Sequence, residues 1–144
     1  MIDLLVLGGG INGVGIANDA AGRGLSVVLC EQNDLASATS SASSQLIHGG
    51  LRYLEQYEFR LVRESLKERS VLLQMAPHIV SPLQFFMPHN RHQRPAWLIR
   101  AGLWLYDRLA GRNQLAHSHA VKFAHHIAGV PLKDTIKKGF SYYD

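Results

Sequence analysis

Residues 4–31 read LLVLGGGINGVGIANDAAGRGLSVVLCE, and this stretch decides the fold. It contains, in order, a short apolar run, three glycines in the spacing GxGxxG, a stretch of helical character, a second apolar run and an acid. These parts occupy 4–7, Gly8, Gly10 and Gly13, 12–21, 25–30, and Glu31. The order is typical of a βαβ unit that binds a dinucleotide. The sequence therefore predicts an α/β fold with a Rossmann-like unit, in which two parallel strands are joined by a right-handed crossover.

Each glycine of the predicted turn has a physical role. Gly8 allows the sharp turn off the strand, Gly10 lets the backbone approach a diphosphate, and Gly13 lets the helix lie close to the sheet. The helix begins near Ile11 and Asn12, where unpaired N–H groups and partial positive charge favour an anion.

Glu31 follows the second predicted strand, where a carboxylate can accept hydrogen bonds from ribose hydroxyls. Its charge would repel a 2′-phosphate, so FAD or NAD fits better than NADP. The glycine spacing alone does not choose between FAD and NAD. An ordinary α/β turn without a nucleotide is the alternative to a cofactor site.

The composition suits one folded domain, with 144 residues and 47% hydrophobic content. The formal charge of +4 gives a weak attraction to anions such as phosphates, acidic lipids or nucleic acid. Because Lys and Arg form no block of the kind that binds nucleic acid, we do not expect a nucleic-acid partner.

The single cysteine, Cys30, excludes an internal disulfide framework. It lies in an apolar strand pattern, so we expect a buried core thiol. No apolar run approaches the roughly 20 residues needed to span a bilayer. Asp3 stands where a signal peptide would carry basic residues. The expected location is therefore the cytoplasm, with the inner face of the membrane left open.

Small hydroxyl residues dominate 36–44, which read ASATSSASS. The segment is either a flexible linker or a loop that admits a ligand closely and offers donors to phosphate or ribityl oxygens. The ordered-looking sequence on both sides favours the second interpretation. The candidate ligand-binding residues are Thr39, Ser40, Ser41 and Ser44.

The next stretch, 45–54, reads QLIHGGLRYL. Gly49 and Gly50 permit unusual backbone angles or a close approach to a flat ring. Arg52 and Tyr53 are candidates for an anion clamp and a hydroxyl contact. His48 by itself is more often a structural histidine than a catalyst.

Beyond this stretch we expect helices at 55–75 and 96–109 and a short strand at 83–87. The second helix carries tryptophans and arginines, which can mark a membrane-surface contact, although packing against its own protein is the alternative. We do not expect a metal site among the histidines near the end of the chain, because no Cys or closely spaced acid completes a ligand set.

Three stretches together resemble the amino-terminal part of bacterial FAD-dependent, aerobic-type glycerol-3-phosphate dehydrogenases. They are GGGINGVGIANDAAGRGLSVVLCE, then TSSASSQLIHGGLRYLEQYEFRLV, then MAPHIVSPLQFFMPH with RPAWLIRAGLWLYDRL. The pattern SSxLIHGGLRYLE is far more specific than the glycines alone. The resemblance implies the D-amino-acid-oxidase-like group of FAD-binding folds. It implies a first part of the FAD-binding domain at 1–75 and the start of a substrate or cap region at 76–144.

The resemblance also implies an activity. The family oxidises sn-glycerol 3-phosphate to dihydroxyacetone phosphate by passing a hydride to the flavin, and electrons then go to a membrane quinone. Its members are peripheral proteins on the cytoplasmic face of the membrane. In the family, the glycine-rich turn and the acid matching Glu31 hold the ADP half of FAD. The Ser-rich segment and His48, Gly49 and Gly50 lie along the flavin, and Arg52 and Tyr53 face the substrate.

Two departures from the family pattern qualify these expectations. Family members often carry lysine where this chain has Gln45, and they are several times longer. We therefore expect little or no turnover from the chain alone. The alternatives are a non-catalytic remnant that binds an adenine dinucleotide, another FAD-dependent oxidoreductase of the amino-acid oxidase group, or an NAD-linked dehydrogenase. The catalytic base is not identified, and a homodimer is left open.

Overall fold

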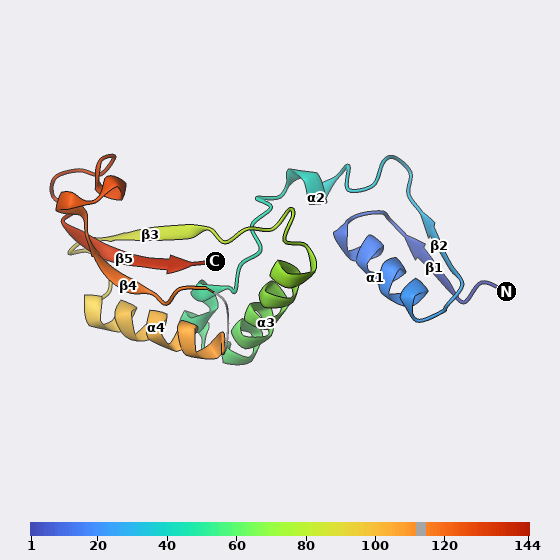
Figure 1. The fold of residues 1–144 in the computed structure, drawn as a ribbon, viewed down its shortest axis with the longest axis horizontal. Coiled ribbons are helices and arrows are strands. Elements are labelled where there is room, and N and C mark those ends of the chain that lie inside the picture. Colours follow the sequence, from blue (N-terminus) through green and yellow to red (C-terminus); the bar gives the residue numbers. More distant parts are fainter. Residues whose placement is uncertain (112–114) are drawn as a thin grey trace. The chain divides into compact units, whose positions relative to one another are not determined.

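The computed structural model describes residues 1–111 and 115–144 and divides into two compact units, 1–46 and 47–144 (Figure 1). The division falls after Leu46, so the long helix of 59–75 belongs with the second unit. The predicted boundary near residue 75 separates a cofactor-binding part from a substrate-binding part of a larger enzyme. This division of roles stays a prediction.

The first unit is the expected βαβ arrangement. Its elements are β1 (Leu4–Leu7), α1 (Ile11–Gly22), β2 (Val27–Cys30) and a single helical turn, α2 (Thr39–Ala42). Strands β1 and β2 pair in parallel, with Leu4 opposite Val27 and Leu7 opposite Cys30. The predicted second strand begins later than expected, because Leu25 still donates its N–H to the carbonyl of Ala20 at the end of α1.

The expectation of a buried thiol at Cys30 is wrong, because the side chain is exposed. Paired residues of neighbouring strands share a face of the sheet, so Cys30 lies on the face of Leu7. Helix α1 packs on the opposite face, that of Val6. Val6 is 8% exposed whereas Leu7 is 77% exposed. An apolar strand pattern indicates a strand but does not tell which face is covered.

The second unit combines two helices with an antiparallel sheet (Figure 1). A 3₁₀ helix, η1 (Leu51–Gln56), precedes α3 (Phe59–Met75), β3 (Gln84–His89) and α4 (Ala96–Leu109). Then follow β4 (His119–Lys122), two short 3₁₀ turns, η2 (Phe123–His125) and η3 (Ile127–Gly129), and β5 (Lys138–Tyr143). The strand order is β3-β5-β4, so the last strand of the chain is central.

Two predicted elements of this unit have different bounds in the structure. The helix predicted at 55–75 begins at Phe59, because Tyr57 takes a left-handed conformation with φ +61° and ends η1. The strand predicted at 83–87 continues to His89, because it pairs with β5 over six residues. Pro88 is tolerated there because β3 is an edge strand. The predicted helix at 96–109 is confirmed.

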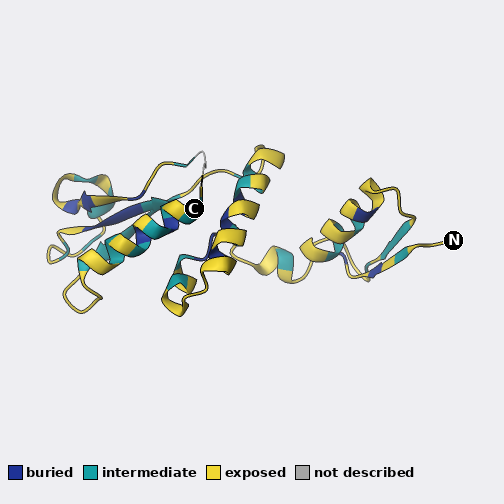
Figure 2. Ribbon diagram, turned by 90° about the horizontal axis from the view of Figure 1, so that it is seen from below, coloured by how far each residue is buried: buried dark blue, intermediate teal, exposed yellow. Residues whose placement is uncertain are grey.

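The core of the second unit lies between α3 and α4. Val62 and Leu66 of α3 pack with Tyr106 of α4, and all three are buried. Figure 2 colours the buried residues of the chain dark blue. Partly buried side chains from η1, the end of α4 and β5 surround them: Leu51, Leu54, Leu109, Ala110 and Tyr142. The turn that carries His48 to Tyr53 is therefore built against the core of this unit. Within the described ranges, no helix combines the length and the apolar character needed to cross a bilayer.

Candidate functional site

The contact between the glycine-rich turn and helix α1 leaves no room for a side chain at Gly13. Gly8 has φ +105°, a conformation that favours glycine. A Cβ atom at Gly13 would lie 1.9 Å from the carbonyl oxygen of Gly8. A Cβ atom at Gly10 would lie 3.3 Å from Oγ of Ser40. The spacing of the glycines thus has a steric cause: helix α1 starts against the backbone of the turn.

The first turn of α1 presents backbone N–H groups. Gly10 caps the helix without a side-chain hydrogen bond, and the N–H of Ile11 donates to Oγ of Ser40 at 2.9 Å. In the unit of residues 1–46, nothing accepts the N–H groups of Asn12 or Gly13. These donors, with the positive end of the helix dipole, suit the diphosphate of a dinucleotide.

Glu31 is tied to the glycine-rich turn. Its carboxylate accepts the N–H of Gly9 at 2.6 Å and the N–H of Asn33 at 2.9 Å. These two backbone donors, the Gly9 amide first, lower the pKa of Glu31 below its usual value. The carboxylate is therefore charged at neutral pH. It has lone pairs left for the hydroxyls of a ribose.

A cavity of about 420 Å³ lies beside these groups, lined by Gly8, Cys30, Glu31 and Gln32. It is formed where β1 and β2 end, which is the edge at which open α/β sheets bind their ligands. The cavity, the enclosed glycines and the charged Glu31 together fit the ADP half of a dinucleotide.

The Ser-rich segment forms defined turns. Oγ of Ser41 donates to the carbonyl of Ala38 at 2.9 Å, and Oγ of Ser43 donates to the carbonyl of Ser40 at 3.1 Å. Of the predicted hydroxyl residues, Ser40 is the one whose side chain forms a hydrogen bond to the glycine-rich turn within residues 1–46. Thr39, Ser41 and Ser44 are exposed on the same segment.

The turn at His48–Gly50 belongs to the second unit. Gly50 has φ +73°, and its N–H donates to Nδ1 of His48 at 3.1 Å. Nδ1 of His48 is thus the acceptor in this hydrogen bond. Gly49 is enclosed, because a Cβ atom there would lie 2.2 Å from Cδ2 of Leu66 and 2.3 Å from the Tyr106 hydroxyl.

A buried polar cluster that the sequence did not predict supports this turn. Asp144, at the end of β5, accepts hydrogen bonds from the Gly49 N–H at 3.0 Å and from the Tyr106 hydroxyl at 2.9 Å. It also pairs with Nη1 of Arg69. Burial, and then the negative charge of Asp144, raise the pKa of Tyr106 far above its usual value. No local motif marks these residues, because they come from three separate elements.

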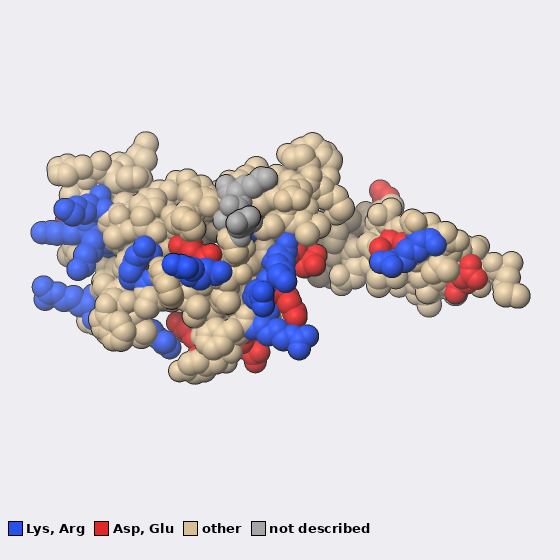
Figure 3. Space-filling model, turned by 60° about the horizontal axis from the view of Figure 1, so that its bottom comes forward, with Lys and Arg blue, Asp and Glu red and all other residues tan. Residues whose placement is uncertain are grey.

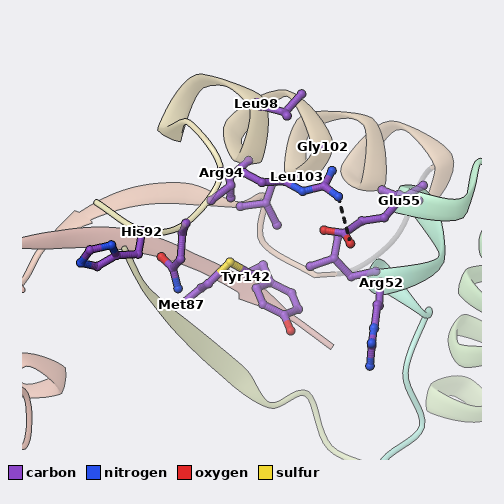
Figure 4. A pocket seen from close by; sticks show the side chains of 13 residues that line it. Arg52, Glu55, Met87, His92, Arg94, Leu98, Gly102, Leu103 and Tyr142 are labelled. Carbon is purple, nitrogen blue, oxygen red and sulfur yellow. Dashed lines mark ion pairs between the residues drawn. The ribbon is translucent and has the colours of Figure 1, made fainter. Parts of the chain in front are cut away.

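A larger cavity of about 730 Å³ opens next to Arg52 (Figure 4). Leucines of η1 and α4, together with Met87 and Tyr142, form most of its apolar wall. Glu55 and Arg94 form an ion pair of 3.5 Å at its wall, and the side chain of Arg52 extends away from that pair. Arg52 lines the cavity, whereas Tyr53 does not.

Charge is distributed unevenly along the chain. Residues 47–144 carry 14 of the 15 Lys and Arg but 7 of the 11 Asp and Glu. The basic side chains lie over many parts of this unit in the view shown (Figure 3). In the part of the chain that the structure describes, no three His, Cys, Asp or Glu side chains form a group that could hold a metal ion.

The predicted site residues therefore fall into two groups. The first unit contains the predicted binding residues of the ADP half and the hydroxyl segment: Gly8, Gly10, Ile11, Asn12, Gly13, Glu31, Thr39, Ser40, Ser41 and Ser44. The second unit holds the residues predicted to lie along the flavin and the substrate: His48, Gly49, Gly50, Arg52 and Tyr53. The sequence missed Gly9, Arg69, Tyr106 and Asp144. For Gly9, its place as the middle glycine of the run GGG at 8–10 is the available signal.

Comparison with known proteins agrees with the cofactor geometry. The family model described as FAD dependent oxidoreductase matches residues 3–144. The chain is 68% identical over 142 residues to a glycerol-3-phosphate dehydrogenase of Pseudomonas tolaasii, covering 99% of this chain and 27% of that protein. It is 63% identical to the aerobic glycerol-3-phosphate dehydrogenase of Escherichia coli, with 99% and 28% covered. The chain thus spans little more than a quarter of the length of these relatives.

Two further proteins are similar to this chain. A D-erythritol 1-phosphate dehydrogenase of Brucella abortus is 58% identical over 142 residues, which are 99% of this chain and 28% of that protein. Among solved structures, glycine oxidase from Bacillus cereus matches with a TM-score of 0.59 at 20% identity. That match covers 99% of this chain and 38% of the oxidase, and it shows a shared fold.

Proposed function

The chain belongs to the family of FAD-dependent oxidoreductases, and from this premise we propose that it is the FAD-binding portion of a glycerol-3-phosphate dehydrogenase. The reaction is oxidation of sn-glycerol 3-phosphate to dihydroxyacetone phosphate. One structural observation carries the cofactor part of the proposal: the carboxylate of Glu31 is hydrogen-bonded to the Gly9 N–H of the glycine-rich turn. The identity of 68% and 63% to proteins of that name supports the substrate.

In the proposed complex, the N–H groups of Asn12 and Gly13 bind the diphosphate and Glu31 binds the ribose next to adenine. Thr39, Ser40, Ser41 and Ser44 offer hydroxyl groups to the diphosphate and the ribityl chain. The enclosed backbone at Gly49 and Gly50, with His48, lies along the ring system. When bound, FAD supplies the ring that accepts the hydride.

Arg52 and Tyr53 are the proposed substrate contacts. Arg52 lines the cavity of about 730 Å³ and offers a planar guanidinium, which suits a phosphate. Tyr53 offers a hydroxyl group to the alcohol. The relative named for D-erythritol 1-phosphate, at 58% identity, favours sugar-alcohol phosphates as the wider substrate class.

The electron acceptor and location follow from the same proposal. We infer a membrane quinone as acceptor and a peripheral position on the cytoplasmic face of the membrane. The exposed Trp97 and Trp104 of α4 support a surface contact, and the guanidinium of Arg108 lies 5.1 Å from the ring centre of Trp104. A homodimer stays part of the proposal.

We propose that this chain binds FAD but turns over little substrate. It spans 27% of the P. tolaasii relative, and the groups supplied by the remaining length of such an enzyme contribute to transition-state binding. Dye reduction by the purified chain with glycerol 3-phosphate at a rate typical of enzymes would contradict this statement.

Titration of FAD into the chain tests the cofactor site. Gly13→Ala places a methyl group against the Gly8 carbonyl and should abolish quenching of FAD fluorescence. Gly15→Ala is the matched control, because it lies in the same helix and its Cβ would enter open space. If both variants bind FAD like the wild type, or if the wild type does not quench FAD at all, the cofactor site is wrong.

A further inference from the structure

The backbone of Gly49 is held by a carboxylate 95 residues further along the chain. Its buried N–H donates to Oδ1 of Asp144 at 3.0 Å. A buried N–H must have a partner. The neighbouring Leu66 and Tyr106 leave no space for a water molecule where a Cβ would stand. The conformation of this turn therefore depends on the position of the Asp144 carboxylate.

The carboxylate itself is fixed from several sides. Its side chain is 5% exposed, and the side chain of its partner Arg69 is 3% exposed. The Tyr106 hydroxyl lies 2.9 Å from Oδ1 and 3.1 Å from Oδ2. The backbone of Asp144 exchanges two hydrogen bonds with Leu83, at 2.9 and 3.0 Å. Asp144 thus contacts Arg69 of α3, Tyr106 of α4 and the backbone of Leu83 next to β3.

The Gly49–Gly50 turn leads directly into η1, which contains Arg52. After Gly49, Gly50 takes φ +73° and its carbonyl accepts the N–H of Tyr53 at 2.9 Å, which starts η1. Arg52 lies inside this short helix, whose start is set by the turn. We propose that Asp144 is a positioning residue, which fixes the Gly49–Gly50 turn and through it the part of η1 that carries Arg52 to the cavity. The inference rests on the proposed substrate role of Arg52.

The test compares the wild-type chain with Asp144→Asn, Tyr106→Phe and the control Asp134→Asn, by hydrogen exchange of single amides in NMR spectra. Asp144→Asn keeps the size of the side chain and removes its charge. Asp134 is an exposed acid of the same unit. We expect about tenfold faster exchange at the Gly49 amide in Asp144→Asn, because hydrogen bonds to charged groups are the strong ones. Asp134→Asn should match the wild type.

Binding of glycerol 3-phosphate, followed on the side-chain N–H signals of Arg52, gives the second measurement. We expect a severalfold weaker response in Asp144→Asn and none of this loss in Asp134→Asn. If Arg52 of the wild type does not respond, the substrate proposal fails, and exchange at Gly49 and amide shifts at 51–53 still decide the positioning role.

Three results would overturn the inference. The first is an unchanged exchange rate at the Gly49 amide in Asp144→Asn. The second is an equal acceleration of exchange at Gly49 and at the distant Val121 in that variant. The third is that the amide shifts at 51–53 and the Arg52 response both stay unchanged in that variant. If Asp144→Asn does not fold, Tyr106→Phe decides. It removes one donor to the carboxylate and should accelerate exchange at the same amides by a smaller factor.

Discussion

The carboxylate of Glu31 accepts a hydrogen bond of 2.6 Å from the backbone N–H of Gly9. This contact ties the end of β2 to the turn that leaves β1, 22 residues earlier. Since Asn33 donates to the second oxygen, the carboxylate is held in place before any sugar reaches it. A preorganised acceptor of this kind binds a ligand with a smaller loss of side-chain entropy.

Replacing Glu31 should weaken binding of FAD. Glu31→Gln keeps the length of the side chain but removes its charge. The hydrogen bonds from Gly9 and from the ribose then involve a neutral acceptor and are weaker. We expect the dissociation constant for FAD to rise about tenfold. Fluorescence titration measures it. Asp19→Asn, which removes the same charge from an exposed position of α1, should leave it unchanged.

The same residue predicts a pH dependence of stability. The amides of Gly9 and Asn33 lower the pKa of Glu31 in the folded chain below its ordinary value of 4.5. The stabilisation is therefore complete above pH 4.5 and is lost as the pH falls through the lower, folded-state pKa. Melting temperatures of the wild type and Glu31→Gln should differ at pH 7 and converge as the pH falls through the folded-state pKa of Glu31. If the difference in melting temperature grew on acidification, the pKa of Glu31 would be raised on folding and not lowered.

Cys30 should react with a thiol reagent in the folded chain, because it is exposed and lines the cavity beside Glu31. We expect stoichiometric labelling by Ellman's reagent without denaturant. Saturating FAD or ADP should slow the reaction, since the nucleotide would fill that cavity. Glycerol 3-phosphate is the control and should not protect. Labelling at the same rate with and without FAD would place the nucleotide elsewhere.

The core of the second unit predicts a large stability effect at Leu66. The side chain is fully buried between α3 and α4, so Leu66→Ala should lower the free energy of unfolding by about 2–5 kcal/mol. Leu61→Ala, in the same helix at a position 42% exposed, should change it by less than about 1 kcal/mol. Urea unfolding followed by circular dichroism compares the two. Equal losses of unfolding free energy in the two variants would mean that Leu66 does not lie on the buried side of α3.

Local features of this chain could be predicted well from the sequence. The glycines at Gly8 and Gly13 and the acid at Glu31 predicted the βαβ unit, because turn, helix and parallel strand lie within 28 consecutive residues. The helix at 96–109 was also predicted, since its apolar residues recur with helical spacing. The binding roles of Arg52 and Tyr53 stay predictions.

Features that depend on distant contacts could not be predicted. The burial of Cys30 was predicted wrongly, because its apolar neighbours in sequence do not tell which face of the sheet α1 covers. The start of α3 was misplaced because the left-handed conformation of Tyr57 leaves no mark in the periodic pattern. The central place of β5 in its sheet is likewise set by pairing with β3 and β4, not by its own sequence.

By itself, the sequence determined the dinucleotide-binding unit and the family, because glycine spacing and strand patterns act between near neighbours. Only the tertiary structure decided that Asp144 meets Gly49, Arg69 and Tyr106 in one buried cluster. The physical reason is that a buried charge is stable only where partners from several elements surround it. Arg69 lies on α3, Tyr106 on α4 and Asp144 directly after β5, so the cluster exists only in the packed structure.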